Sequence, residues 1–305
     1  MQRYLIRRVL WLIPVMIFIS LITFALMHSV PGGPWDREKK LAPSVVENLN
    51  RRYGLDKPYW EQYTNFLVNA ARGDLGVSFI YQDRKVTDVI SEGLPVTATL
   101  ALVAVGVALI VGVPLGIAAA LRQNSWIDYI CLFVATIGAS VPNFVMGMVL
   151  IIVLSVGLHL LPTGGWGDWQ KVVMPALALG SYPAALLARI TRASMIEAIR
   201  QDYVRTARAK GLVETVVLTR HIVKNALIPV VTILGPLAAT LITGSFIIES
   251  IFAIPGVGKF YIQAIFARDY GLMMGMTLFY AVTIAVANLL VDIMYAFIDP
   301  RIRYH

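Results

Sequence analysis

The sequence predicts an all-α, polytopic membrane helix bundle with six transmembrane helices and a small helical extracytoplasmic subdomain. The 305 residues are 58% hydrophobic and 14% charged, with a mean hydropathy of +0.71, which is outside the range of soluble globular domains. Six mainly apolar stretches are each long enough to cross about 30 Å of hydrocarbon. Basic residues concentrate in alternate connections between these stretches, as they do in membrane proteins of fixed orientation.

The first apolar stretch covers residues 9–30 and follows Arg3, Arg7 and Arg8. A secretory signal also begins with basic residues, but this apolar run has about 22 residues and no small-residue cleavage site after it. We therefore expect residues 1–30 to form an uncleaved first transmembrane helix.

Residues 31–95 are expected to form the extracytoplasmic subdomain. They carry nine basic and nine acidic residues, and a segment of this length is translocated largely regardless of its charge. Two parts of it, "SVVENLNRRYGL" and "YWEQYTNFLVNAARG", repeat apolar residues at helical spacing. They end near Gly54 and Gly73, and glycine commonly follows the last helical residue, so both parts are predicted to be helices.

The five later stretches lie within an expected transmembrane core of residues 96–299 and cover residues 97–121, 129–160, 172–190, 227–248 and 273–298. The second of these five is ambiguous, because residues 126–161 are 36 residues long and predict either one bent helix or a tight hairpin. Pro142 would supply a bend, since proline lacks a backbone donor and crowds the preceding turn. The single cysteine, Cys131, lies in this stretch and excludes an internal disulfide framework.

The distribution of basic residues favours the bent helix over the hairpin. With one span in this stretch, 14 basic residues share one side of the membrane, and the short connections opposite carry only Lys171, Lys259 and Arg268. Because basic residues collect on the cytoplasmic side, both termini are expected in the cytoplasm. Residues 300–305 would then be a cytoplasmic tail.

The connection of residues 191–226 would also be cytoplasmic, and its 36 residues are far more than two antiparallel helices need. It contains the basic sequence "RTARAKGL". The pattern predicts a helix from Thr191 that ends at Gly211, whose missing Cβ suits a left-handed conformation. A second short helix would follow, with Val213, Val216 and Val217 on one side. Anionic lipid headgroups would explain the basic residues, but the length, the glycine and the apolar side favour a surface that docks on a protein.

The connection resembles the cytoplasmic coupling loop of binding-protein-dependent ABC importer permeases, whose pattern is Glu-Ala-Ala, three residues, then Gly. Here the matching positions read Arg205, Thr206, Ala207, three residues, and Gly211, followed by "TRHIVKNALIP". The Glu and the first Ala are absent, as expected of the peptide/nickel branch. Six further segments of the chain resemble the same branch and occur in the expected order. They are "RYLIRRVLWLIPVMIFISLITFALMHSVPGGP", "RRYGLDKPYWEQY", "GDLGVSF", "IESIFAIPGVGKF", "ARDY" and "IDPRIRY".

The resemblance is closest to the oligopeptide permease transmembrane subunit of the first type, and it implies the type I ABC importer permease fold. It also implies a bacterial inner-membrane subunit that pairs with a homologous permease, two cytosolic ATPase subunits and an extracytoplasmic peptide-binding protein. Oligopeptide import is the implied function; dipeptides, glutathione or nickel chelates are alternative substrates of the same branch. The expected ATPase-docking residues are Arg205, Ala207, Arg208, Lys210, Gly211, Leu212, Glu214 and Val216.

The sequence "IPGVGKF" superficially resembles a nucleotide-binding loop. That motif needs Gly at the position of Ala253 and Ser or Thr at the position of Phe260. In the family the segment is an external turn beside the pathway mouth, so Pro255, Gly256 and Gly258 are candidate contacts with the binding protein or the peptide. A plain Pro/Gly turn is the alternative.

Three acidic or amide residues in the apolar stretches are also candidates. Glu249, at the outer end of the apolar stretch 227–248, is expected to be a pathway residue or a hydrated acid at the membrane interface. Asp292 is costly in lipid, so with Asn288 one turn earlier it is expected to face the bundle interior. There a hydrogen bond to a neighbouring helix is favoured, and contact with the substrate is the alternative.

No catalytic residues, metal ligands or cofactor site are expected in this chain. Its four histidines are scattered without metal-ligand spacing, so ATP hydrolysis is expected in the partner subunits. The net charge of +8 follows from topology and requires no nucleic acid, while membrane lipid is an expected partner. An ion-coupled secondary transporter and an intramembrane hydrolase stay open as other classes, although neither symmetric repeats nor a Ser-His pair is visible.

Overall fold

The computed structural model describes residues 2–35, 41–81 and 84–298, and within these ranges its regular secondary structure is helical apart from one β-bridge between Val77 and Lys85. It forms two compact units. The first combines the chain up to Pro95 with Gly256–Val286, and the second combines Val96–Pro255 with the stretch that begins at Ala287. The expected cytoplasmic tail, residues 300–305, lies outside the described residues.

The first unit contains four complete helices and the ends of two longer ones. These are α1 (Gln2–Ser29), α2 (Pro43–Tyr53), α3 (Tyr59–Ala71), the start of α4 (Val86–Leu121), α13 (Val257–Ala267) and the start of α14 (Tyr270–Ile298). Val86 and Ile90 of α4 pack with Val257, Leu272 and Met276 in one buried core. The compact unit is therefore larger than the expected subdomain of residues 31–95.

The two helices predicted in this segment are confirmed, and glycine follows the end of each. Gly54 has φ +68° directly after α2, and Gly73 has φ +85° two residues after α3. In both cases the residue after the glycine donates its backbone N–H to a carbonyl oxygen five residues earlier, from Leu55 to Asn50 O and from Asp74 to Asn69 O. Such bonds satisfy carbonyl groups that the helix leaves without a partner.

The segment of residues 75–81 is held against the start of α14. Gly271 makes this possible, because a Cβ at Gly271 would lie 2.1 Å from Val77 O. The buried carboxylate of Asp269 accepts hydrogen bonds from the Ser78 hydroxyl and from two backbone N–H groups, of Phe79 at 2.9 Å and Ile80 at 3.1 Å. Its other oxygen accepts from Leu272 N at 3.0 Å, so Asp269 also caps α14.

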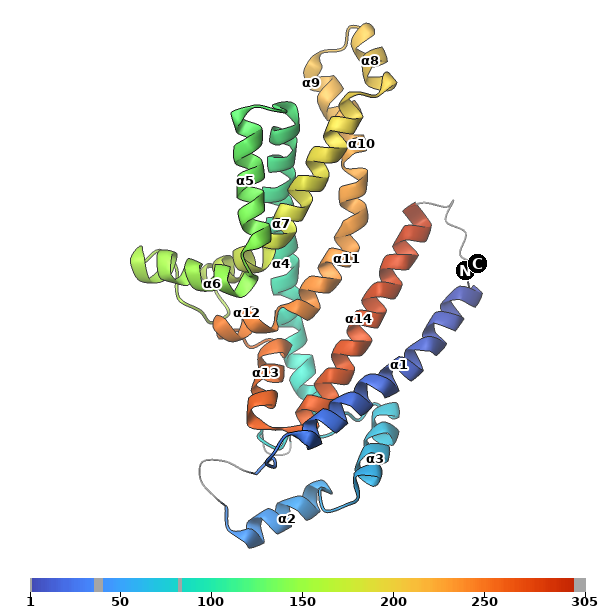
Figure 1. Ribbon diagram of the computed structural model, residues 1–305, viewed down its shortest axis with the longest axis vertical. Coiled ribbons are helices and arrows are strands. Elements are labelled where there is room, and N and C mark those ends of the chain that lie inside the picture. Colours follow the sequence, from blue (N-terminus) through green and yellow to red (C-terminus); the bar gives the residue numbers. More distant parts are fainter. Residues whose placement is uncertain (1, 36–40, 82–83, 299–305) are drawn as a thin grey trace. The chain divides into compact units, whose positions relative to one another are not determined.

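The second unit is an all-helical bundle. It contains the rest of α4, α5 (Trp126–Ser140), α6 (Asn143–Leu150), the π-helix η1 (Ile151–Gly157), α7 (Trp169–Ile199), α8 (Asp202–Ala209), α9 (Glu214–Val216), the π-helix η2 (Val217–Val223), α10 (Lys224–Ala226), α11 (Ile228–Gly244) and α12 (Phe246–Ile251) (Figure 1). Leu100 of α4, Met174 and Leu179 of α7, Leu241 of α11 and Phe252 share its main core.

Helices α4 and α7 approach each other backbone to backbone. A Cβ at Gly112 would lie 2.4 Å from Ala184 O, and one at Gly116 would lie 2.5 Å from Ala188 O. From the other side, a Cβ at Gly180 of α7 would lie 2.8 Å from Ala104 O. Small residues at such crossings let membrane helices gain dispersion contacts that lipid cannot replace.

Four helical segments are long and apolar enough to cross a membrane: Leu10–Ser29, Val86–Leu121, Trp169–Ile199 and Tyr270–Leu289. Two further bent pairs pass the same test, Trp126–Ser140 with Asn143–Gly157 and Glu214–Ala226 with Ile228–Ile242. The predicted six spans are reached when each bent pair counts as one. In the second pair, Ile228–Ile242 corresponds to the predicted stretch 227–248, and Glu214–Ala226 belongs to the connection that is predicted to be cytoplasmic. Helix α11 ends at Gly244, so the predicted stretch 227–248 is interrupted before α12.

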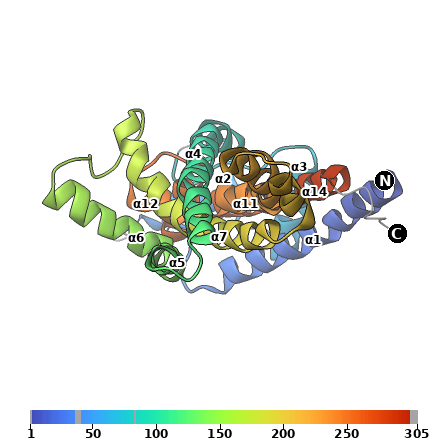
Figure 2. The ribbon, with the colours of Figure 1, turned by 90° about the horizontal axis from the view of Figure 1, so that it is seen from above.

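The ambiguous stretch of residues 129–160 is neither a gently bent helix nor a tight hairpin. Its two parts meet at an angle of 106°, with the break at Val141 and Pro142. Figure 2 views α5 nearly end-on and shows α6 leaving it sideways. The expectation that Pro142 marks the bend is confirmed, since residues before proline are pushed out of the helical region and Val141 has ψ 122°.

Candidate functional site

The predicted cytoplasmic connection forms a helical elbow, which we define as residues 200–226. Helix α7 continues without interruption to Ile199, and Gln201 then takes an extended conformation with ψ 150° before α8 begins at Asp202. The single helix predicted from Thr191 to Gly211 is therefore wrong in one respect, because it is broken at Arg200 and Gln201. Figure 1 shows α8 and α9 turned back on each other beyond the end of α7.

The turn of the elbow has the left-handed glycine that its sequence predicts. Gly211 has φ +74°, and its N–H donates to Arg208 O at 2.9 Å. Leu212 N donates to Ala207 O at 3.4 Å, which completes the helix-ending pair of bonds. A Cβ at Gly211 would meet no atom within 4 Å, so the requirement for glycine comes from φ alone.

An apolar core inside the elbow holds it to the long helices. Val204 and Ala207 of α8 pack with Val217 and Ile222 of η2 and with Met195 of α7. Ala120, at the end of α4, belongs to the same buried cluster. The elbow therefore shares one packed core with the ends of α4 and α7.

This core changes the expected roles of two residues. Ala207 was predicted among the docking residues and Val217 on the docking side of the second helix, but both are buried within the chain. Their side chains support the elbow from inside, since an amphipathic helix turns its apolar stripe toward its own core.

The outer face of the elbow combines apolar and basic side chains. Val213 is 69% exposed and Leu212 is 40% exposed, while Val216 is half-buried. Arg205 and Lys210 are exposed beside them. Exposed apolar groups ringed by polar ones are typical of a surface that another protein covers.

Arg208 and Glu214 join the two arms of the elbow. Arg208 Nη2 donates to Glu214 Oε1 at 2.6 Å and Arg208 Nε donates to Oε2 at 3.1 Å. The hydrogen bond from Arg208 holds the pKa of Glu214 below its ordinary value, so the pair stays ionised at neutral pH. Both side chains are exposed, and the pair's role is to align the arms rather than to stabilise the fold.

A second charge pair lies where α5 meets α7. Arg192 Nε donates to Asp128 Oδ1 and Arg192 Nη2 donates to Asp128 Oδ2, both at 2.7 Å, and Asn124 N donates to Asp128 Oδ2 at 2.9 Å. Asp128 is buried. The bidentate pair fixes the start of α5 and the turn before it to α7, seven residues before α7 ends at Ile199.

The structure buries the Glu249 side chain completely. Its Oε1 accepts hydrogen bonds from Thr97 Oγ1 at 2.8 Å and from Ser245 Oγ at 2.6 Å. Glu249 therefore connects α4 to the break between α11 and α12. This burial is inconsistent with the hydrated interface acid that was the alternative, and a pathway role stays a prediction.

In the segment "IPGVGKF", Pro255 is exposed, whereas Gly256 and Gly258 are buried. Gly256 precedes α13, and a Cβ on Gly93 of α4 would lie 2.7 Å from Val257 N. Gly256 thus stands where the backbones of α4 and the turn meet, and of the three candidates Pro255 is the one with an accessible side chain. Contact with a partner stays a prediction for this turn.

Asn288 and Asp292 both lie on α14. Asn288 is exposed in this single chain, and the side chain of Asp292 lies outside the described residues. Their expected helix-to-helix bond stays a prediction.

Sequence reasoning missed two buried carboxylates. Asp269 directly precedes an apolar helix and Asp128 follows Ser125 in a first helical turn, so helix-start patterns would have identified both as structural. Their partners Ser78 and Arg192 carry no such signal. Within residues 2–35, 41–81 and 84–298, no three His, Cys, Asp or Glu side chains gather as metal ligands would.

Comparison with protein families matches nearly the whole chain. Residues 112–304 match the model described as binding-protein-dependent transport system inner membrane component. Residues 1–101 match the N-terminal part described for membrane components of the same systems.

Similar proteins of known name are permeases. The dipeptide transport system permease protein DppB of Bacillus subtilis (strain 168) is 41% identical over 305 residues, which cover 100% of this chain and 99% of that protein. The oligopeptide transport system permease protein OppB of Escherichia coli (strain K12) is 39% identical over 306 residues and is covered completely, as is this chain.

Solved structures share the fold. An inward-facing form of the MetNI methionine ABC transporter matches 70% of this chain and 97% of its own chain, with a TM-score of 0.59 at 16% identity. An amino acid ABC transporter matches 68% of this chain and 93% of its own, with a TM-score of 0.52 at 20% identity. The helical core is therefore arranged as in the membrane subunits of type I ABC importers.

Proposed function

Because the chain belongs to the family of binding-protein-dependent transport system inner membrane components, we propose that it is the membrane-spanning permease subunit of an ATP-driven peptide importer. It would form half of the translocation pathway in a bacterial inner membrane. A homologous second permease would form the other half, and two cytosolic ATPase subunits and an extracytoplasmic peptide-binding protein would complete the importer. Both termini would face the cytoplasm.

The elbow is the observation that carries this proposal. It presents Leu212 and Val213 to the outside, with basic residues around them, while its inner face is bound into a core with α4 and α7. Such a part transmits motion as a rigid body, because its packed interior does not deform continuously. An ATPase seated on the tip would move α4 and α7 together.

The Asp128–Arg192 pair extends this lever to a third helix. It connects α7 to the start of α5 through two charge-assisted hydrogen bonds of 2.7 Å. A displacement of the elbow would therefore reach α5 as well as α4 and α7. ATP hydrolysis itself would occur in the partner subunits, and this chain would convert their movement into opening of the pathway.

Peptides are the substrate class that the relatives support. Relatives of about equal identity are named for dipeptides and for oligopeptides, so the proposal does not choose between these lengths. The expected oligopeptide substrate and the alternatives of glutathione or nickel chelates stay open. The family assignment disfavours an ion-coupled secondary transporter.

The test is reconstitution of the chain with its partner subunits, followed by measurement of ATPase retention and ATP-dependent uptake of a labelled tripeptide. Val213→Glu places a carboxylate on the exposed apolar tip. We expect the variant to keep its sister permease but to lose ATPase subunits, and uptake to fall by about tenfold or more, because an unpaired charge in an interface is costly.

Thr219→Glu is the matched control, since Thr219 is also exposed in the elbow and the added charge is the same. It should keep ATPase subunits and uptake. Normal retention and uptake in Val213→Glu would contradict docking at the tip. Wild-type chain that never retains an ATPase subunit would contradict the importer function itself.

A further inference from the structure

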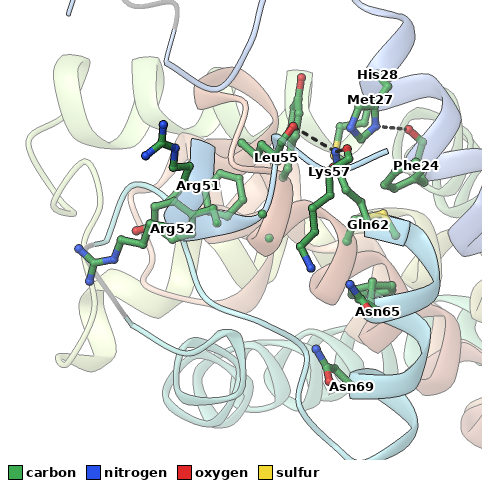
Figure 3. A pocket seen from close by; sticks show the side chains of 17 residues that line it. Phe24, Met27, His28, Arg51, Arg52, Leu55, Lys57, Gln62, Asn65 and Asn69 are labelled. Atoms are coloured by element: carbon green, nitrogen blue, oxygen red, sulfur yellow. Dashed lines mark hydrogen bonds between the residues drawn. The ribbon is translucent and has the colours of Figure 1, made fainter. Parts of the chain in front are cut away.

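The first unit contains a cavity that the proposed function does not use. Its volume is about 420 Å³, and it is lined by the end of α1, by α2, α3 and the connection between them, and by the start of α14 (Figure 3). This volume is within the range of small-molecule pockets. A second hollow of about 460 Å³ adjoins it and shares His28, Leu55, Gln62 and Tyr270 with it.

The cavity lies at the level where two apolar spans end. The span in α1 ends at Ser29, and Phe24, Met27 and His28 of its last turns line the cavity. The span in α14 begins at Tyr270, which lines it from the first turn. The ends of membrane spans mark the boundary between hydrocarbon and water, where lipid headgroups lie.

Aromatic rings around the cavity agree with this level. The His28 ring lies 4.7 Å from the Tyr59 ring and 5.1 Å from the Tyr270 ring, measured between centroids. Phe24 and Tyr63 are 5.4 Å apart. Tyrosine rings with one apolar and one polar end are enriched at this depth in membrane proteins.

The charges that line the cavity have one sign. Arg51, Arg52 and Lys57 contribute to its wall, and among the residues that the structure describes no Asp or Glu does. The carboxamides of Asn65 and Asn69 add N–H donors, whereas Gln62 Nε2 donates to the backbone oxygens of Leu55 at 3.2 Å and Lys57 at 2.7 Å and so holds the wall in place. Figure 3 shows Lys57 extending along the side of α3 that carries Asn65 and Asn69.

Lys57 and Arg51 are paired with carboxylates outside the wall. Lys57 Nζ donates to Glu61 at 2.7 Å, and Arg51 Nη2 lies 2.5 Å from Glu47 Oε1. Both pairs lie at the surface, where an ion pair typically contributes little, so they do not prevent the two basic groups from binding a phosphate. The hydrogen bond to Glu61 raises the pKa of Lys57, so this group is cationic at neutral pH.

We propose that the cavity binds the headgroup phosphate of an anionic phospholipid. The basic and amide groups donate to the phosphate oxygens, while the adjoining hollow takes the rest of the headgroup. The acyl chains lie along α1, where Phe18, Leu21 and Leu26 have exposed apolar side chains. The site is independent of ATPase docking, because it lies in the first unit and contains no residue of the elbow.

The experiment uses the importer complex in phosphatidylcholine nanodiscs that contain a phosphatidylglycerol probe with a photoreactive group near its headgroup. Cross-linked peptides are mapped by mass spectrometry. We expect label on the peptides that contain residues 24–28 and 51–69. A phosphatidylcholine probe with the same photoreactive group should label them much less.

The test variant is Arg52→Gln/Lys57→Gln, which removes two charges from the wall. Labelling by the phosphatidylglycerol probe should fall by about tenfold or more, because each basic residue strengthens the binding of an anionic lipid. Arg52→Lys/Lys57→Arg should keep the label. Arg72→Gln, which removes an exposed charge of the same unit outside the wall, should also keep it. Equal thermal unfolding midpoints for the three variants would show that the fold is retained.

Four outcomes would overturn the proposal. They are equal labelling of the wild type and the Gln double variant, equal labelling by the two lipid probes, displacement of the label by excess inorganic phosphate, and displacement by excess trialanine. The third would assign the cavity to a free anion, and the fourth would assign it to the transported peptide.

Discussion

At the scale of single residues, Gly211 has a backbone requirement that can be tested directly. Its φ of +74° is costly for a β-branched residue, by about 1–2 kcal/mol or more, whereas asparagine adopts this region more readily. No atom lies within 4 Å of the position of a Cβ, so crowding does not contribute. We therefore expect Gly211→Val to distort the elbow and Gly211→Asn to preserve it.

The measurement is ATPase retention and peptide uptake at matched membrane levels of both variants. Gly211→Val should still insert and pair with its sister permease, because the long helices fold elsewhere, but it should lose ATPase subunits or coupling. If lipid headgroups were the only partners of the elbow, the two variants would behave alike. Normal uptake in Gly211→Val would therefore count against the docking role.

At the scale of elements, the crossing of α4 and α7 fixes the relative position of the two long helices on which the elbow is packed. At Gly112 a methyl group would lie 2.4 Å from the carbonyl oxygen of Ala184, and a backbone atom cannot rotate away. We expect Gly112→Ala to separate the two helices locally and to destabilise the second unit by about 1–3 kcal/mol, the usual cost of overpacking.

Gly106→Ala is the control for this prediction, because Gly106 is on the same helix and a Cβ there would meet nothing within 4 Å. It should be neutral or slightly stabilising, since alanine is the better helix former. Thermal unfolding of the purified complex in detergent measures both. If the thermal unfolding midpoints of Gly112→Ala and Gly106→Ala were equal, the crossing would accommodate a methyl group and the prediction would be wrong.

At the scale of the whole molecule, the distribution of 14 basic residues against three predicts the orientation in the membrane. In a Cys131→Ser background, a cysteine at Arg72 should react with an impermeant thiol reagent in intact cells, and a cysteine at Lys210 should react only after the cells are opened. Both positions are exposed in the chain, so accessibility depends on the membrane. Labelling at Lys210 from outside would reverse the orientation and remove the elbow from the ATPase.

Prediction from the sequence was accurate for local features. The helices before Gly54 and Gly73, the left-handed Gly211 and the bend at Pro142 depend on residues within one or two helical turns, and all four are confirmed. The break at Arg200 and Gln201 was missed, because neither residue is a strong helix breaker and the interruption serves the packing of α8.

The sequence by itself determined the membrane class, the apolar stretches, the basic elbow and the family resemblance, since these depend on composition, hydrophobic period and short motifs. The tertiary structure decided which side chains face inward. Ala207 and Val217 became elbow core, Glu249 became a buried link to Thr97, and Asp128 found Arg192, 64 positions away. The physical reason is that lipid and protein interior are equally apolar, so the hydrophobic period of a membrane helix does not tell which face meets protein. Whether a given face of a helix contacts lipid or another helix is therefore known only from the tertiary structure.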